Sequence, residues 1–153
     1  MTVFDGELVA IFIAAEHGAA MRSVERAAAQ AGQGLVGDRH CRANITPKPH
    51  GDVTLIEEEA IAAAAHDYDL ALQACHSRRN LVTRGIALNH FAHCTFRVGN
   101  VLIEGLELCE PCGHLEKLTL PGVRKALIHR GGLRARIVEG GTLTVGDRVR
   151  PVE

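Results

Sequence analysis

Two cysteines spaced three residues apart carry the clearest chemical signal in this sequence. Cys109 and Cys112 follow a short apolar run, with Pro111 between them and Gly113 directly after. Pro111 fixes its own φ, lacks an amide donor and disfavours helix at the preceding residue, so we predict a strand-to-helix turn here. A helix that opens at Gly113 would bring free amides near Cys112 and favour its thiolate, the form that attacks electrophiles and binds metals.

The two thiols are not expected to be equivalent. Cys109 ends the apolar run from Val101 to Leu108, where burial would raise its pKa and make it inert. Cys112 stands between a proline that stiffens the turn and a glycine that leaves the sulfur unobstructed. We therefore predict that Cys112 is the reactive thiol and that Cys109 is a candidate second, resolving thiol.

Basic and polar residues are grouped at the start of an expected strand. Arg78, Arg79 and Asn80 precede an apolar run that begins at Leu81. Arginine forks bind phosphate or carboxylate groups in a bidentate manner, although charges at the start of a strand can equally face solvent.

A glycine-rich stretch from Gly32 to Gly37, followed by Asp38 and Arg39, indicates tight turns or a close approach of the backbone to a ligand. A surface loop in which Asp38 caps a turn explains the same residues. No Gly-Lys-Ser/Thr follows the glycines, so the spacing is not that of a phosphate-binding P-loop, nor does it match the dinucleotide-binding pattern.

Composition places the chain among single-domain proteins with an aliphatic core. Its 153 residues suit one domain spanning residues 1–153, and aromatic residues make up only 3%. The formal net charge of −1 gives no reason to expect a nucleic acid or an anionic membrane as partner. The apolar run from Leu8 to Ala15 is too short to span a membrane and lacks the flanks of a signal peptide.

The cysteines favour a reducing compartment. Their number, five, is odd, and Cys41, Cys75 and Cys94 are scattered along the chain. A disulfide framework is therefore not expected, and reduced thiols predict a cytoplasmic protein.

Hydrophobic patterning predicts mostly short strands. The expected strands are Glu7–Ile13, Asp52–Ile56, Thr95–Val98, Val101–Leu108, Leu133–Val138, Thr142–Val145 and Arg148–Arg150, and Ser77–Gly85 is expected to be a loop that enters a strand. A helix is expected from Glu57 to about His66, and helical segments after Cys112 and around Pro121. Residues 23–29 are ambiguous between helix and strand, and the proline-bearing residues 42–51 are expected to form a loop. Short strands with glycine-rich turns predict a mainly β (α+β) sandwich or barrel with a few helices on its rim.

Six segments, taken in order, resemble those of the MOSC domain family. They are Gly34–Arg39, Asp52–Glu57, Arg78–Val82, Phe96–Gly99, Cys109–Cys112 and the stretch from Gly131 to Asp147. This domain forms the C-terminus of molybdenum-cofactor sulfurases, and it occurs as free-standing bacterial proteins and in the mitochondrial amidoxime-reducing component. The resemblance covers nearly the whole chain and implies a barrel-like β domain of short strands with a few peripheral helices.

The resemblance also implies a molybdopterin-type cofactor and chemistry at the cysteine that follows the proline, here Cys112, which could also ligate molybdenum. The arginines would grip the cofactor phosphate and Asn80 would hydrogen-bond the pterin. The candidate cofactor-binding residues are Gly37, Asp38, Arg39, Arg78, Arg79, Asn80 and Arg130. The chain has no pyridoxal-phosphate desulfurase domain, so no site for that cofactor is expected, and a cysteine desulfurase or a molybdoenzyme is the candidate protein partner.

Several functions fit these residues. Family members are proposed to carry sulfur as a persulfide, and others reduce N-hydroxylated compounds with bound molybdenum. A non-catalytic cofactor carrier is a third possibility, and structural zinc is a fourth, since Cys109 and Cys112 are half of a zinc ribbon by spacing. The other half would have to come from residues such as His90, His93 and Cys94. A dithiol oxidoreductase needs a thioredoxin-like βαβ context, which the strand-rich pattern disfavours.

Overall fold

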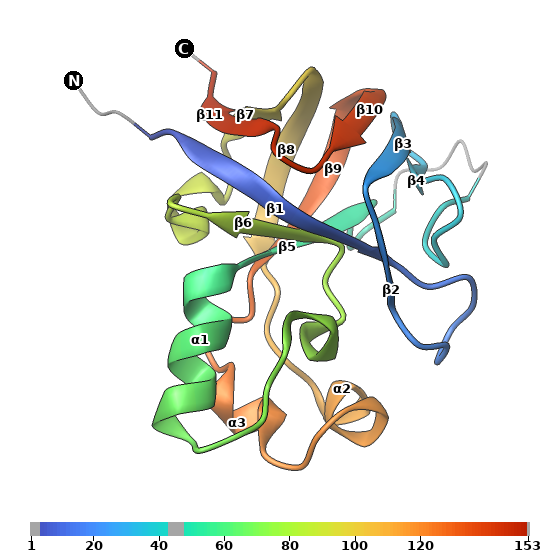
Figure 1. The fold of residues 1–153 in the computed structure, drawn as a ribbon. Coiled ribbons are helices and arrows are strands. Elements are labelled where there is room, and N and C mark those ends of the chain that lie inside the picture. The colour runs from blue at the N-terminus through green and yellow to red at the C-terminus, as the bar shows by residue number, and fades with distance from the viewer. Residues whose placement is uncertain (1–3, 43–47, 153) are drawn as a thin grey trace.

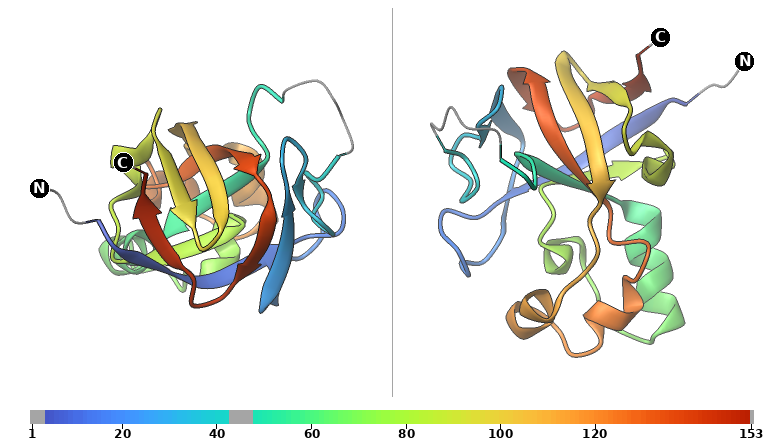
Figure 2. Two further views of the ribbon diagram at one scale, coloured as in Figure 1. Left: turned by 90° about the horizontal axis from the view of Figure 1, so that it is seen from above. Right: turned by 180° about the vertical axis from the view of Figure 1, so that it is seen from behind.

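A closed barrel of seven strands forms the body of the protein. The computed structural model describes residues 4–42 and 48–152. The barrel strands are β1 (Gly6–Ile13), β5 (Val53–Glu57), β6 (Leu81–Arg84), β7 (Thr95–Val98), β8 (Val101–Leu108), β9 (Leu133–Glu139) and β11 (Arg148–Pro151). They pair in the order β11-β7-β8-β9-β5-β6-β1, and β1 pairs back to β11, so the sheet closes into the ring seen from above in Figure 2. The predicted barrel with few helices is confirmed.

A second, three-stranded sheet resolves the ambiguity of residues 23–29. Strand β2 (Arg22–Val24) pairs antiparallel with the end of β1 in the large sheet. In the second sheet β3 (Arg26–Gln30) lies between β4 (Gly34–Leu35) and β10 (Gly141–Thr144). Ala27 and Ala29 are buried while their neighbours in β3 are exposed. This alternation packs small side chains against the core, and it outweighs the helix propensity of the alanines.

The helices gather at one end of the barrel (Figure 1). The acidic helix predicted after β5 is present as α1 (Glu58–Asp67), and the predicted helix after Cys112 is α2 (Gly113–Leu118). Around Pro121 the structure has only the short α3 (Val123–Ala126). Single 3-10 turns occupy Ala74–Ser77 and Leu88–Phe91. None of the helices in the described part of the chain is long and apolar enough to cross a membrane.

Two apolar cores result from this arrangement. One fills the barrel, with Phe96, Leu55 and Ile103 fully buried in it. The other lies between the helices and the barrel, where Ile56 and Val82 pack with residues of α1, α2 and α3. The loops that link β8 to α2 and α3 to β9 therefore run along the boundary between barrel and helices.

Of the loop expected at residues 42–51, positions 43–47 lie outside the described residues.

Two glycines bring these loops together. A Cβ atom on Gly131 would overlap the carbonyl oxygen of Cys109, and one on Gly132 would overlap the carbonyl oxygen of Leu55. Gly132 also has a φ of +99°, which side chains rarely adopt. Only glycine lets the loop before β9 pack directly against both β5 and the cysteine loop.

Replacing Gly132 by alanine is expected to lower the free energy of unfolding by roughly 3 kcal/mol or more, because overlap adds to backbone strain. Gly146 is the matched control, since its φ is +101° and a Cβ atom added there would have no neighbouring atom within 4 Å. Gly146→Ala should cost only about 1–2 kcal/mol of strain. Urea unfolding measures both, and equal losses would contradict the close approach at Gly132.

Candidate functional site

The two thiols of the cysteine loop differ sharply in exposure. Cys112 is exposed, whereas Cys109 is buried with 3% of its surface accessible. Cys112 directly precedes α2 in an extended conformation, and its side chain makes no capping hydrogen bond to that helix. The main-chain amide of Cys109 donates to Gly132 O over 2.8 Å. The accessible sulfur of this loop is therefore that of Cys112.

Arg79 ties the cysteine loop to the loop before β9. Its Nε donates to Gly131 O over 2.8 Å and its Nη2 donates to Cys109 O over 2.9 Å. Burial lowers the pKa of the guanidinium, while the nearness of the Cys109 and Cys112 thiols acts in the opposite direction. The side chain expected to grip a phosphate is therefore largely used in holding backbone, within electrostatic range of both thiols.

Glu110 makes a second tie between the same two loops. Its Oε1 accepts a hydrogen bond from the His129 amide over 2.7 Å, and its Oε2 lies 2.8 Å from His129 Nδ1. Partial burial would raise the pKa of this carboxyl, but the contacts with His129 hold it below its ordinary value. His129 has a φ of +61°, so Glu110 also supports a strained backbone position.

Arg39 and Arg78 form a basic cluster beside Arg79. Arg39 Nη2 donates to Arg78 O over 3.3 Å, and Arg78 Nη1 donates to Ala19 O over 2.7 Å. Arg78 Nη2 is buried and has no hydrogen-bond partner among the described residues. Burial, followed by the positive charge of Arg39, lowers the pKa of Arg78. A buried donor without an acceptor is costly, which makes this nitrogen a candidate anion-binding group.

The glycine-rich loop at residues 32–37 leads directly into Asp38 and Arg39 and so positions Arg39 in this cluster. Gly37 has a φ of +90°, and Asp38 is buried. The Asp38 carboxylate accepts hydrogen bonds from the amides of Ala14, over 3.0 Å, and His40, over 3.2 Å. It also pairs with Arg39 Nη1 at 3.2 Å. Asp38 therefore orders the turn and Arg39, and its carboxylate is occupied by these contacts.

The side chains of Asn80 and Arg130 do not join the others. Asn80 is fully buried, where its Oδ1 accepts from Thr54 and its Nδ2 donates to Phe12 O. Arg130 donates to Ala126 O and pairs with Asp67 at the end of α1. Both were expected to contact a cofactor, but in this structure their polar groups are engaged in joining elements of the framework.

Sequence reasoning missed His40, which lies next to Arg39. Its ring stacks edge-on against His17 with the ring centroids 5.7 Å apart. Burial, and then the charge of Arg39, lower the pKa of His40 from 6.5 to about 4, so the ring is neutral near pH 7. Two histidines so far apart in the chain give no sequence signal of this contact.

The structural-zinc interpretation lacks a ligand set. Among residues 4–42 and 48–152, no group of three or more His, Cys, Asp or Glu side chains is arranged to hold a metal ion. Cys94 and His90 instead line a separate hollow with Phe4 and Pro151.

Comparison with known proteins connects this geometry to a family. The family model of the MOSC domain matches residues 42–150. No curated protein sequence matches the chain. Among solved structures, the YuaD protein from Bacillus subtilis superposes with a TM-score of 0.82 at 11% identity, covering 97% of either chain. YiiM from Geobacillus stearothermophilus superposes with a TM-score of 0.74 at 16% identity, covering 97% of this chain and 75% of that one. YiiM from Escherichia coli gives 0.69 at 16% identity, covering 96% and 70%.

The lowered pKa of His40 predicts a pH dependence of stability. In the unfolded chain this histidine takes up a proton below about pH 6.5, whereas the folded protein resists protonation until about pH 4. The free energy of unfolding should therefore fall as the pH drops from 6.5 towards 4, and this contribution should level off below. Denaturant unfolding of His40→Gln should show a shallower fall in that window. Parallel curves for the two proteins would contradict the burial of a neutral His40.

Proposed function

The chain belongs to the MOSC domain family, and from this premise we propose that it binds a molybdenum cofactor and carries sulfur on Cys112 as a persulfide. The observation that carries the proposal is the exposed Cys112 thiol on a loop that Arg79 holds in place. The residue before Arg79 in the sequence is Arg78, whose buried guanidinium has one nitrogen without a hydrogen-bond partner. A reachable soft nucleophile within electrostatic range of the Arg79 guanidinium suits a sulfur carrier that works on an anionic cofactor.

The residues present fit such a cofactor. Arg78 Nη2 offers a buried donor, and Arg39 adds a second positive charge beside it, so the two would hold a phosphate group. When bound, the cofactor would supply a metal centre with affinity for sulfur. Arg79 and Glu110 keep the cysteine loop in place and so orient the thiol. In this arrangement neither of these two side chains would need to contact the phosphate.

The sulfur step on this chain is a thiol exchange. The Cys112 thiolate attacks the terminal sulfur of a donor persulfide, and a new S–S bond forms as the donor S–S bond breaks. The donor leaves as a thiolate with the electron pair of the broken bond and then takes up a proton. No oxidant is needed, and a separate desulfurase can supply the donor persulfide.

A molybdenum-dependent reductase of N-hydroxylated compounds is the alternative use of the same residues. In that reaction Cys112 would serve as a metal ligand, and an electron donor would be required. The two functions therefore differ in whether Cys112 ever bears an additional sulfur atom.

The test is to load the protein with a small-molecule persulfide and locate the added sulfur by peptide mass spectrometry. Cys112 should gain one sulfur atom, and Cys112→Ser should lose this gain while keeping its thermal unfolding. Cys94→Ser is the matched control, because Cys94 is the other exposed thiol of the described chain. Loading that survives Cys112→Ser would contradict sulfur carriage, and a Cys112 that binds molybdenum but never gains sulfur would favour the reductase.

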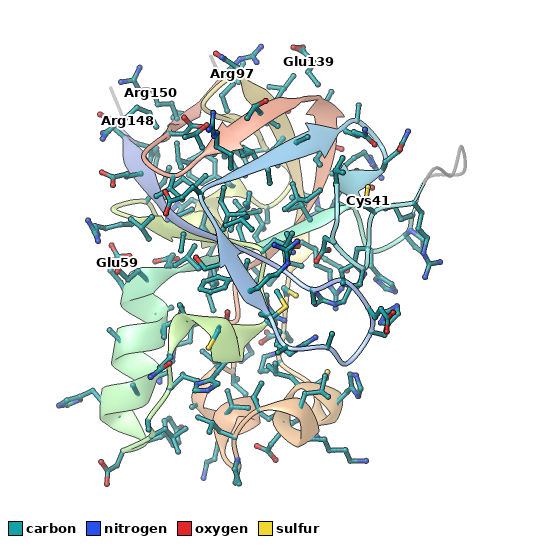
Figure 3. The ribbon with its side chains drawn as sticks, turned by 45° about the vertical axis from the view of Figure 1, so that its right-hand side comes forward. Cys41, Glu59, Arg97, Glu139, Arg148 and Arg150 are labelled. Atoms are coloured by element: carbon teal, nitrogen blue, oxygen red, sulfur yellow. The ribbon has the colours of Figure 1, made fainter. Side chains whose placement is uncertain are left out.

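The proposed binding of the cofactor phosphate by Arg78 and Arg39 leads to a separate prediction. Protein made in a host that synthesises the molybdenum cofactor should retain molybdenum, and Arg78→Gln should lower that content on the order of tenfold, since a charged hydrogen bond contributes about 1.5–3 kcal/mol. Arg97→Gln removes an arginine at the far end of the barrel and should leave the content unchanged (Figure 3). Elemental analysis measures both, and unchanged molybdenum in Arg78→Gln would refute this grip.

A further inference from the structure

Positive charges without a carboxylate partner gather on the helices next to the thiol. Lys117 on α2 and Arg124 and Lys125 on α3 are exposed. Within the part of the chain that the structure describes, the side chains of these three residues form no hydrogen bond or ion pair; Arg124 bonds to Glu116 only through its main-chain amide. We call these three residues the basic collar.

The acidic residues near the collar form no ion pair with it, and each of them has other partners. Glu116 on α2 accepts hydrogen bonds from the amides of Gly122 and Arg124, and Asp67 at the end of α1 pairs with Arg130 at 3.0 Å. Glu110, two residues before Cys112, accepts a hydrogen bond from the amide of His129 and contacts its ring. Arginines on the barrel are paired too, as Arg97 is with Glu139 (Figure 3). The collar therefore carries unpaired positive charge next to the thiol, although the formal net charge of the chain is −1.

The collar borders Cys112. A Cβ atom on Gly113, the residue after the thiol, would lie 3.7 Å from Arg124 Nη1, so this guanidinium sits beside the start of α2. Lys117 lies four residues after Gly113 and thus on the same side of the helix. A partner protein that reaches Cys112 would come within a Debye length of these charges, which is about 8 Å at physiological salt.

We propose that the basic collar is a docking surface for an acidic protein that delivers sulfur to Cys112. This rests on the proposed function, since it assigns a partner to the same thiol. The collar attracts an acidic surface and raises the rate of encounter, while Cys112 lies at the edge where the two proteins meet. Charge complementarity at the rim acts mainly on the association rate and is weakened by salt.

Activated peptides test the collar directly. Each peptide carries one cysteine as a mixed disulfide with thiopyridine, beside four glutamates, four lysines or four serines. Cys112 attacks the peptide sulfur, a new disulfide forms, and the thiopyridine departs with the electron pair and is measured by its absorbance. A Cys94→Ser background removes the other exposed thiol, and peptide mapping confirms the modified residue.

The acidic peptide should react with Cys112 on the order of tenfold faster than the serine peptide, and the lysine peptide more slowly than either. The advantage should largely disappear near 0.5 M salt, where the Debye length is roughly 4 Å. Lys117→Glu with Arg124→Glu should reverse the order of the acidic and basic peptides. Arg97→Glu and Arg150→Glu together make the same change in charge at the opposite end of the barrel and should preserve the order (Figure 3).

The outcomes separate the two proposals. Equal rates for the three peptides at low salt, with Cys112 reactive, would overturn the docking surface alone. A faster reaction of the lysine peptide would overturn it too. If Cys112 fails to react even with the serine peptide, the reactive-thiol proposal is wrong and the docking proposal is overturned with it.

Discussion

The buried guanidinium of Arg79 is the interaction on which the site depends. It bridges the carbonyl oxygens of Cys109 and Gly131 and so joins the loop that leaves β8 to the loop that enters β9. Burying a charge is costly unless it finds hydrogen-bond partners, and here two carbonyl groups accept from its Nε and Nη2. Removing the side chain would leave those carbonyls without a partner, at about 1–3 kcal/mol each. The same bridge keeps Cys109 inside and leaves Cys112 at the surface.

A surplus of positive charge surrounds this bridge. Asp38 pairs with Arg39, yet Arg78 keeps an unpartnered buried nitrogen, and the basic collar adds exposed charges outside. Elsewhere in the described chain, exposed arginines such as Arg84 and Arg148 have carboxylate partners. Uncompensated positive charge close to a reachable thiol is the pattern expected where anionic ligands bind. The thiol chemistry and the electrostatics thus point to the same part of the molecule.

Much of the fold could be predicted because its signals are local. The helix that follows Ile56, the adjacent strands Thr95–Val98 and Val101–Leu108, and the turn at the two cysteines all depend on neighbours in the sequence. The strand at Ala27 and Ala29 could not be decided, since its burial is imposed by β10 and β4 from distant parts of the chain.

The candidate site could be predicted only in part, for the same reason. Residue type suggested that Arg78 and Arg79 bind anions, but it could not tell which of them would instead hold backbone. Arg79 meets partners that lie 30 and 52 residues away, and Asn80 meets Phe12 at a separation of 68. The tie between Glu110 and His129 is likewise long in sequence, and no pattern in either segment indicates it.

The most direct test of the Arg79 bridge is native-state alkylation of Arg79→Gln followed by peptide mapping. In the unaltered protein Cys112 should be modified and Cys109 protected. Arg79→Gln should keep the cooperative unfolding of the barrel while Cys109 becomes modified at a rate approaching that of Cys112, because the bridge that buries it is lost. Continued protection of Cys109 in this variant would show that Arg79 does not hold the cysteine loop, and the central claim would be wrong.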